Sequence, residues 1–325
     1  HPTPELAAKL KNDDAVWGYH LGDEPYPEST FQPLSDQLKV LRKADPNHLS
    51  FINMLSTTGD FLRAYMDIVE PELLSYDYYQ WRWGSDRYFE KLEQFREEAL
   101  KADVPLACCI ESTADPRYGE GHSGNAEKLH QSVYTCLAYG VKGVEWFHCD
   151  GIFKKGTVEL TRSGQDIVQL NAEMKCLGPT LMRLRSVDVY HTEPLPLGTR
   201  STPKEHWIHL IGEEATAGLV LGMFKDDSET NYLDDADIDY FMVTNRDYRH
   251  AQNVVIRFQS KWLGIAPWHA QKKEKRTVER FDKLTGEWAK ISSSAAVGFV
   301  YFIEPGDGEL FKVTTTITMT DETRQ

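Results

Sequence analysis

The first 180 residues alternate between two hydrophobic patterns. Short apolar runs are each followed by a segment in which apolar residues recur every three or four positions, and that spacing is typical of a helix. The runs predict strands at 18–24, 49–55, 73–79, 105–111 and 143–148. The spaced segments predict helices at 4–12, 31–44, 61–69, 86–102, 125–139 and 163–177. Strands that alternate with helices in this way indicate a parallel sheet.

The pattern changes after Pro179, where helical spacing disappears. Short alternating stretches take its place, and they predict strands at 187–190, 206–211, 219–224, 240–243, 254–258, 278–281, 299–303 and 310–313. Alternation at this density is typical of an antiparallel β-sandwich. We therefore expect a parallel α/β domain at 1–180 and a β-sandwich accessory domain at 181–325.

Five βα units are too few for a closed (β/α)₈ TIM barrel, which needs three more. The first strand of this chain behaves like the fourth strand of such a barrel. We therefore expect three further units in an upstream segment, which would cover the free sheet edges. The start at His1-Pro2, without an initiator methionine, fits a trimmed sequence. An open five-stranded sheet is the alternative.

Composition narrows the possible partners. The chain has 325 residues, of which 41% are hydrophobic, so it can bury a large core. Its formal net charge of -14 argues against a nucleic-acid partner, which would need clustered Lys and Arg. The basic cluster at 272–276 is interpreted as a solvated loop. No apolar run reaches the roughly 18 residues that a membrane span requires.

Metal and cofactor sites are not predicted. The five cysteines lack C-x-x-C spacing, and no second pair of His or Cys residues stands at the sequence spacing that would complete a zinc site with His148-Cys149. The acidic run at 226–239 lacks the glycine and terminal glutamate of an EF-hand loop, so it is interpreted as solvated. There is no nucleophile elbow and no glycine-rich phosphate loop. We expect no metal and no organic cofactor.

Two glutamates stand at the ends of predicted strands. Glu24 closes the run GYHLGDEP at 18–25, where Pro25 cannot extend a ladder, and Glu111 closes CCIE at 108–111. The carboxyl ends of parallel strands are where α/β barrels hold their chemistry. Two carboxylates at such strand ends therefore suggest an acid/base pair. Glu145, at the end of the next predicted strand, is the rival to Glu111 for the second acid of this pair. A solvated Asp23-Glu24 pair is the alternative interpretation.

Aromatic and polar residues also gather near these strand ends. Aromatic rings at a strand end can stack on the C–H face of a ligand such as a sugar, and Trp81 or Trp83 is the favoured platform of this kind. Some of these aromatic residues must be ordinary core. The other candidates for substrate binding are His20, Asp23, Asn53, Asp77, Tyr79, Glu145, Trp146 and His148. The glycine-rich stretch 119–124 is interpreted as a mobile loop that closes over substrate.

These motifs together resemble glycoside hydrolases of the clan A type. The resemblance rests on GYHLGDEP, CCIE and the trailing β-sandwich with EPGDGEL at 304–310. It implies a (β/α)₈ barrel in which Glu24 is the acid/base after strand four and Glu111 the nucleophile after strand seven. The chain departs from the clan at Asp23, where an asparagine usually holds the sugar 2-hydroxyl. No family within the clan is identified.

The sequence therefore predicts a retaining glycosidase that acts on a poly- or oligosaccharide. The alternatives are an inverting or lyase-type enzyme on the same scaffold and a catalytically silent glycan-binding protein. The sugar, the linkage and the oligomeric state are not determined by the sequence. A periplasmic or secreted location is expected for a polysaccharide substrate, and a cytoplasmic one for imported oligosaccharides.

Overall fold

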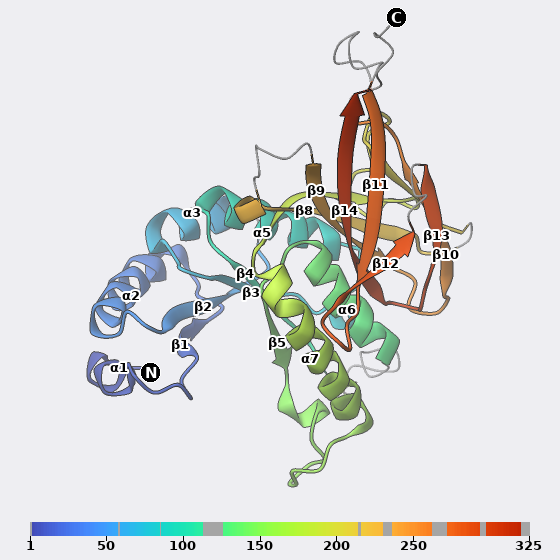
Figure 1. Ribbon diagram of the computed structural model, residues 1–325. Helices are drawn as coiled ribbons and strands as arrows, with labels where there is room; N and C mark the ends of the chain where they lie inside the picture. The colour runs from blue at the N-terminus through green and yellow to red at the C-terminus, as the bar shows by residue number, and fades with distance from the viewer. Residues whose placement is uncertain are drawn as a thin grey trace, which may run out of the picture. The chain divides into compact units, whose positions relative to one another are not determined.

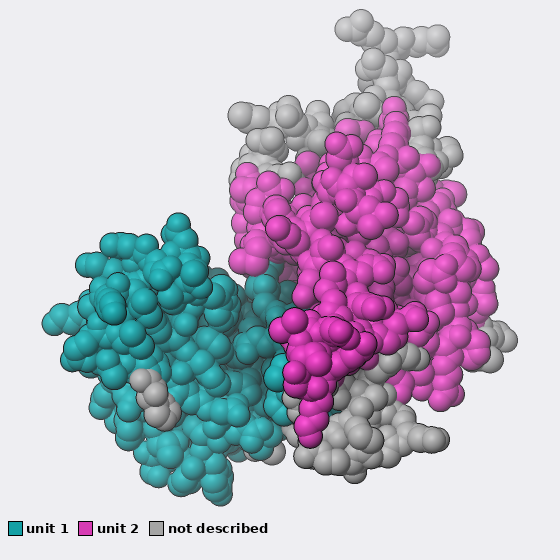
Figure 2. All heavy atoms as spheres, turned by 90° about the horizontal axis from the view of Figure 1, so that it is seen from below, with its two compact units in different colours: residues 1–123, 141–149 teal, residues 124–140, 150–325 magenta. Residues whose placement is uncertain are grey.

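The computed structural model describes residues 2–57, 59–84, 86–112, 126–213, 216–229, 236–261, 272–292 and 297–319. The chain divides into two compact units, which Figure 2 colours separately. Unit 1 comprises residues 1–123 and 141–149, and unit 2 comprises residues 124–140 and 150–325. Part of the region assigned to the α/β domain thus groups with the antiparallel sheets, and the domain boundary at 180 stays a prediction.

Unit 1 is built on one curled parallel sheet of five strands (Figure 1). The strands are β1 (Gly18–Asp23), β2 (Leu49–Leu55), β3 (Leu74–Asp77), β4 (Leu106–Glu111) and β5 (Gly143–Phe147). The helices are α1 (Pro4–Leu10), α2 (Phe31–Ala44), α3 (Gly59–Val69), α4 (Gln80–Trp83) and α5 (Tyr88–Ala102), with the 3₁₀ turn η1 (Glu28–Thr30). A further 3₁₀ turn, η3 (Cys149–Gly151), begins at the last residue of unit 1 and continues into unit 2. The order of the strands in the sheet is their order in the sequence, which confirms the predicted parallel βα arrangement.

Burial separates the central strands from the edge strands. Every residue of β3 and β4 is buried. In β1, by contrast, Tyr19 and Leu21 are buried while His20 between them is exposed. The side chains of β5 are only partly buried, and that of Phe147 is exposed. In the strand order β1 and β5 are the outermost strands, and among the described residues their outer edges are unpaired.

The described residues of unit 2 form two antiparallel sheets and two helices. The six-stranded sheet has the order β12-β11-β14-β9-β8-β6 and the three-stranded sheet the order β13-β10-β7. The strands are β6 (Leu184–His191), β7 (Ile208–Ile211), β8 (Leu219–Asp226), β9 (Ala236–Asn245), β10 (Gln252–Phe258), β11 (Lys272–Phe281), β12 (Trp288–Ser292), β13 (Gly298–Ile303) and β14 (Gly308–Met319). The helices are α6 (Ala126–Ala138) and α7 (Arg162–Leu181), with the 3₁₀ turn η4 (Asp227–Glu229). One buried apolar cluster takes side chains from both sheets, including Phe241, Ile256 and Phe311.

One prediction for this unit is wrong. The basic cluster at 272–276, interpreted above as a solvated loop, belongs to strand β11. It pairs with β14 from Lys272, opposite Met319, onward. The Arg276 side chain is buried and donates to the carbonyl oxygen of Gln259 at 2.7 Å. Pairing with a long neighbouring strand thus overrides the polar composition of the segment.

Helix α6 lies close against the six-stranded sheet. A Cβ atom at Gly222 of β8 would stand 2.0 Å from the carbonyl oxygen of Ala138. A Cβ atom at Gly308 of β14 would stand 2.7 Å from the Tyr134 ring. Glycine at these two positions therefore lets the sheet backbone approach the helix. This explains why β8 is buried along nearly its whole length.

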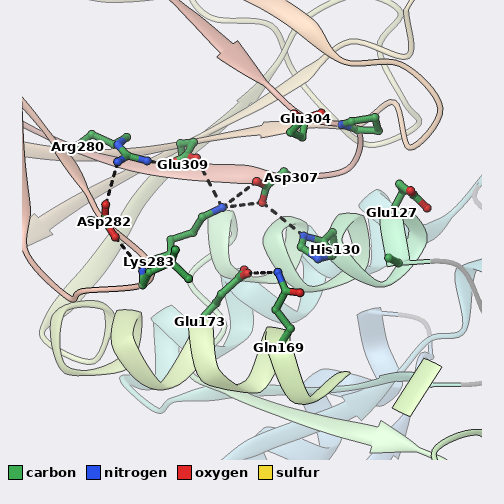
Figure 3. Close-up of a pocket in the computed structure, with 13 residues that line it drawn as sticks. Glu127, His130, Gln169, Glu173, Arg280, Asp282, Lys283, Glu304, Asp307 and Glu309 are labelled. Atoms are coloured by element: carbon green, nitrogen blue, oxygen red, sulfur yellow. Dashed lines mark hydrogen bonds and ion pairs between the residues drawn. The ribbon is translucent and has the colours of Figure 1, made fainter. Parts of the chain in front are cut away.

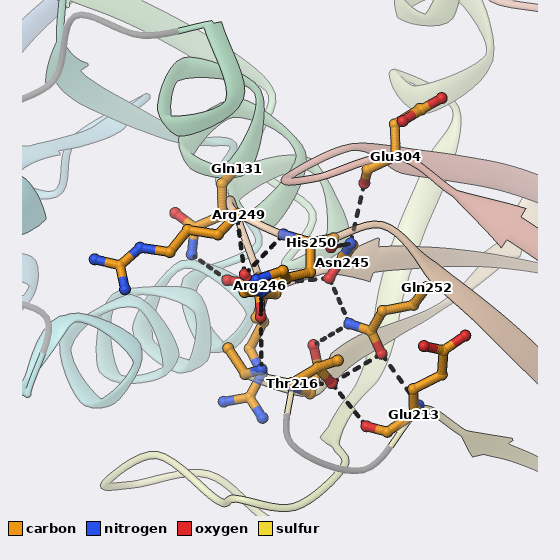
Figure 4. A network of polar contacts seen from close by, with 12 residues as sticks. Gln131, Glu213, Thr216, Asn245, Arg246, Arg249, His250, Gln252 and Glu304 are labelled. Carbon is orange, nitrogen blue, oxygen red and sulfur yellow. Dashed lines mark hydrogen bonds and ion pairs between the residues drawn. The ribbon is translucent and has the colours of Figure 1, made fainter.

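A buried polar network ties together the loops at one end of these sheets (Figure 4). The Asn245 amide donates to the carbonyl oxygens of His250 at 2.8 Å and Glu304 at 3.1 Å. The Gln252 amide donates to Asn245 Oδ1 at 2.5 Å, and its oxygen accepts from the Thr216 hydroxyl at 3.0 Å. Because both amide side chains are fully buried, these bonds replace the hydrogen bonds that water would supply.

Candidate active site at the carboxyl ends of the parallel strands

The register of the parallel sheet brings polar residues of neighbouring strands side by side. Asp23 of β1 is opposite Asn53 of β2, and Asn53 is opposite Ser75 of β3. Asp77 and Glu111 are the last residues of β3 and β4. Parallel strands present their carboxyl ends at the same edge of a sheet, so the spacing in the sequence places these side chains at one edge.

Hydrogen bonds join these residues into a group that we name the strand-end cluster. Its members are Asp23, Asn53, Ser75, Asp77 and Glu145. The Asn53 Nδ2 group donates to Asp23 Oδ1 at 3.0 Å and to Asp77 Oδ1 at 3.1 Å, one hydrogen for each carboxylate. The Ser75 hydroxyl lies 3.2 Å from Asn53 Oδ1 and 3.4 Å from Glu145 Oε1. Acids from three strands are thereby linked through one amide and one hydroxyl.

Asp77 is the most buried acid of the cluster, with 1% of its surface exposed. Its Oδ2 atom is buried and has no hydrogen-bond partner among the described residues. Burial, followed by the charges of Glu24 and Asp23, raises the pKa of Asp77 from 3.8 to about 7. The hydrogen bond from Asn53 opposes that rise. A substantial fraction of Asp77 is therefore a neutral acid at neutral pH.

Glu24 follows β1 directly and is exposed. Its backbone has a φ of 46°, in the left-handed region that few non-glycine residues adopt. Its N–H donates to the Asn53 carbonyl oxygen at 2.8 Å, which fixes the turn against β2. Partial burial of the carboxyl group and the charge of Asp23 raise the pKa of Glu24.

Glu145 lies on β5 and is partly buried. Burial raises the pKa of its carboxyl group, while the charge of His20 and the Ser75 hydroxyl oppose that rise. Of the predicted residues, the structure thus brings Asp23, Asn53, Asp77 and Glu145 into one hydrogen-bonded group.

Glu111 is held by the short helix α4. Its surface is 3% exposed. The Trp81 backbone N–H donates to Glu111 Oε2 at 2.9 Å, and Arg82 Nε lies 3.6 Å from Oε1. The Arg82 guanidinium also lies 5.3 Å from the centre of the Tyr79 ring. The buried Glu111 carboxylate therefore has both a hydrogen-bond donor and a positive charge next to it.

Arg82 was not among the residues predicted from the sequence. Strand 73–79 was expected to run on to Tyr79, but β3 ends at Asp77 and α4 begins at Gln80. The only local signal was a cationic residue inside the aromatic segment Gln80–Trp83. Its partner Glu111 lies 29 positions further along the chain, and only the fold shows that they meet.

The remaining predicted residues occupy varied positions. The Tyr79 side chain is buried, stacks on Phe147 and has its hydroxyl 3.8 Å from Cys109 Sγ. His20 is exposed and stacks on Phe51. Trp81, Trp146 and His148 are partly buried. The side chain of Trp83 and the loop 119–124 lie outside the described residues. The role of Trp81 or Trp83 as a sugar platform stays a prediction.

Unit 2 has a separate charged pocket of about 430 Å³ (Figure 3). Potential metal-ligand atoms of His130, Glu173 and Asp307 lie within 4.8 Å of one another there. The Lys283 ammonium group, however, lies 2.8 Å from both carboxylate oxygens of Asp307. Glu173 accepts hydrogen bonds from Tyr134 at 2.6 Å and Gln169 at 3.1 Å. These carboxylates are thus already engaged by groups of the protein itself.

The search for membrane-spanning segments covered the described residues. None of their helices combines the length and the apolar character that a bilayer span needs.

Comparison with known proteins finds likeness only among solved structures. No protein-family model matches the chain, and no curated protein matches it. The endo-β-1,4-mannanase from Thermotoga petrophila has a TM-score of 0.39 at 10% identity, over 74% of this chain and 67% of that one. The GH27 β-L-arabinopyranosidase from Geobacillus stearothermophilus has a TM-score of 0.45 at 9% identity, over 99% and 63%. The α-L-arabinofuranosidase from Thermotoga maritima has a TM-score of 0.40 at 10% identity, over 90% and 62%.

These structures are glycosidases, the class of enzyme that the sequence resembles, and the family within that class is not resolved. The chain spans 62–67% of the length of the three proteins. At these identities and TM-scores, no residue role transfers from them to this chain.

Proposed function

We propose that the chain is part of a glycoside hydrolase that cleaves glycosidic bonds in a poly- or oligosaccharide. The observation that carries the proposal is the gathering of acids in contrasting environments at one edge of a parallel sheet. Glu24 is accessible and has a raised pKa, whereas Glu111 is buried beside a donor and a cation. Glycosidic cleavage requires two carboxyl groups in contrasting environments, one that can donate a proton and one that can act as a carboxylate.

In the proposed mechanism Glu24 is the general acid/base and Glu111 the nucleophile. Glu24 gives its proton to the leaving oxygen while Glu111 forms a bond to the anomeric carbon. A water molecule then attacks that carbon, transfers a proton to Glu24 and releases Glu111. The Trp81 N–H and Arg82 hold the Glu111 carboxylate in place for the attack. Trp81, Trp83 and Trp146 would stack on sugar rings, and His20, Asn53 and His148 would bind hydroxyl groups.

The finer architecture belongs to the same proposal. We read the curled sheet as part of a (β/α)₈ barrel, in which further strands outside this chain pair with the free edges of β1 and β5. The two antiparallel sheets would form a β-sandwich, since one buried cluster takes side chains from both.

The test is hydrolysis of a panel of aryl glycosides and oligosaccharides by the protein together with any upstream segment. Glu111→Gln removes the nucleophile and is expected to abolish turnover. Glu24→Gln should lower kcat about 10²–10⁴-fold on oligosaccharides. The loss should be much smaller on glycosides whose leaving group needs no proton. Glu97→Gln, an exposed change on α5, is the matched control.

Other outcomes would redirect the assignment. Turnover that persists in Glu111→Gln but fails in Glu145→Gln would make Glu145 the nucleophile. Retention of the anomeric configuration in the first product, measured by NMR, would support the covalent mechanism, which needs the carboxyl groups about 5–5.5 Å apart. Inversion would imply a separation of about 6.5–9.5 Å. Glycan binding without turnover by any variant would identify a silent glycan-binding protein.

A further inference from the structure

The strand-end cluster and the adjacent Glu24 carry negative charge that no cation of the described chain neutralises. Among the described residues, no Lys, Arg or His lies within ion-pair distance of the four acids at this edge, which are Asp23, Glu24, Asp77 and Glu145. Glu111, by contrast, has the Arg82 guanidinium beside it. Two acids that the proposed mechanism does not use, Asp23 and Asp77, therefore stand unpaired next to the proposed proton donor.

Asp77 is the acid that this lack of positive charge affects most. Only 1% of its surface is exposed, and its Oδ2 atom is buried without a hydrogen-bond partner among the described residues. Its Oδ1 atom accepts from the same Asn53 Nδ2 group as Asp23 Oδ1, at 3.1 Å and 3.0 Å. One nitrogen atom thus holds a buried and an exposed carboxyl group near each other. A buried carboxylate is costly, and a positive charge close to it offsets that cost.

Asp23 makes the negative charge of the cluster accessible. It is exposed at the carboxyl end of β1. Glu24, the proposed proton donor, follows it directly in the chain and is also exposed. Because the two residues are adjacent, a sugar bound for cleavage at Glu24 has substituents within reach of the Asp23 carboxylate. A cationic substituent would meet the exposed acid first and the buried charge of Asp77 behind it.

The spacing of these acids favours an organic cation over a metal ion. Among the described residues, no three ligand atoms of these acids lie within 4.8 Å of one another, in contrast to His130, Glu173 and Asp307 of unit 2. A metal ion needs such convergence, because its oxygen ligands stand only about 2.0–2.6 Å from it. An ammonium group needs one charged acceptor, and its other hydrogens bond equally well to hydroxyl groups or water.

We propose that the substrate is an amino sugar, whose ammonium group is held by Asp23 with the charge of Asp77 behind it. This inference rests on the proposed glycosidase function and names the substrate class of the same site. A hydrogen bond between an ammonium group and a carboxylate is stronger than one from a neutral hydroxyl group. A sugar with a free amino group therefore binds this edge better than the matching neutral sugar. An N-acetylated amino group carries no charge and loses this advantage.

The test compares aryl glycosides that differ only at the amino group, in both the gluco and the galacto series. Each series contains the amino glycoside, its N-acetyl derivative and the neutral glycoside, assayed at low salt and at a pH where the amine is protonated. We expect kcat/KM of the parent to be about tenfold or more higher for the amino glycoside than for the other two. Added salt should reduce this preference.

Asp23→Asn is the decisive variant, because it keeps an oxygen for the Asn53 bond and removes the charge. The preference for the amino glycoside should fall close to one, while kcat/KM for the neutral glycoside changes much less. Asp67→Asn, an exposed acid on α3, should keep the preference of the parent. Equal kcat/KM values in the parent would overturn the inference and leave the proposed function standing. A preference that persists in Asp23→Asn would overturn it too, since its origin would lie elsewhere.

A binding measurement separates this inference from the proposed function. Calorimetric titration of the parent with a glucosamine oligosaccharide, and with its N-acetylated counterpart, reports the charge preference without any turnover. We expect the amino oligosaccharide to bind about tenfold or more tightly, and Asp23→Asn to remove the difference. Equal affinities, or no binding of either oligosaccharide, would overturn the inference. Binding of Ca²⁺ alone that is lost in Asp23→Asn would also overturn it, because the acids would then form a metal site. A binding preference without cleavage of any glycoside would support the ammonium site and refute the proposed function.

Discussion

The burial of Asp77 makes a quantitative prediction about folding that does not depend on any activity. Its pKa rises from 3.8, the value of an unperturbed group, to about 7 in the folded chain. Each pKa unit corresponds to about 1.4 kcal/mol, so ionising Asp77 costs the folded state about 4 kcal/mol. The unfolded state loses its proton first as the pH rises. Stability from this group is therefore full below pH 4 and decreases until the pH passes about 7.

Asp77→Asn removes this dependence. We expect the free energy of unfolding of the variant, relative to the parent, to increase by about 4 kcal/mol between pH 4 and pH 8. Urea denaturation of both proteins at several pH values measures the difference, and contributions from other titrating groups cancel in it. The same difference for Asp67→Asn, an exposed acid on α3, should remain nearly constant. A constant difference for Asp77→Asn would refute the claim that burial raises the pKa of this acid in the folded chain.

Three further predictions concern the two units. Arg82→Met removes the cation beside the buried Glu111 and should destabilise unit 1 by on the order of 3 kcal/mol, measured by urea denaturation. The double variant with Glu111→Gln should recover much of the lost stability. Stability losses that simply add in the double variant would contradict the pairing. Gly222→Ala places a methyl group 2.0 Å from the Ala138 carbonyl and should lower Tm, whereas Gly178→Ala, with open space around it, should not. An aryl uronide should show a lower kcat/KM than the matching neutral glycoside, because the acidic strand-end cluster repels its carboxylate. Added salt should reduce the difference between the two kcat/KM values. Equal kcat/KM values for the two substrates at low salt would argue against a negatively charged site.

The sequence was sufficient for the parallel sheet because its signals are local. Each strand of unit 1 is a short apolar run with a helical pattern behind it, and Glu111 ends its strand as predicted. The link between Asp23 and Asn53 could not be predicted, since it depends on the register of β1 against β2. Arg82 was missed because α4 interrupts what looked like a continuous strand and loop.

In unit 2 as well, two features could not be predicted from the sequence. Strand β12 (Trp288–Ser292) has a mixed polar composition that gave no strand signal, and it exists because it pairs with β11. The charge run at the start of β11 was misread because a solvated loop and a strand paired on a long neighbour share the same composition. Pairing between distant segments, which composition does not record, decided both cases.

The free edges of β1 and β5 have a practical consequence for handling this polypeptide. Unpaired strand edges are templates for association with other chains, and β5 carries the exposed Phe147. The chain produced alone is therefore expected to aggregate as its concentration rises, and light scattering should increase with concentration. A lysine or proline placed on the outer edge of β1 would slow that aggregation, whereas changes on the fully buried β3 would only unfold the sheet.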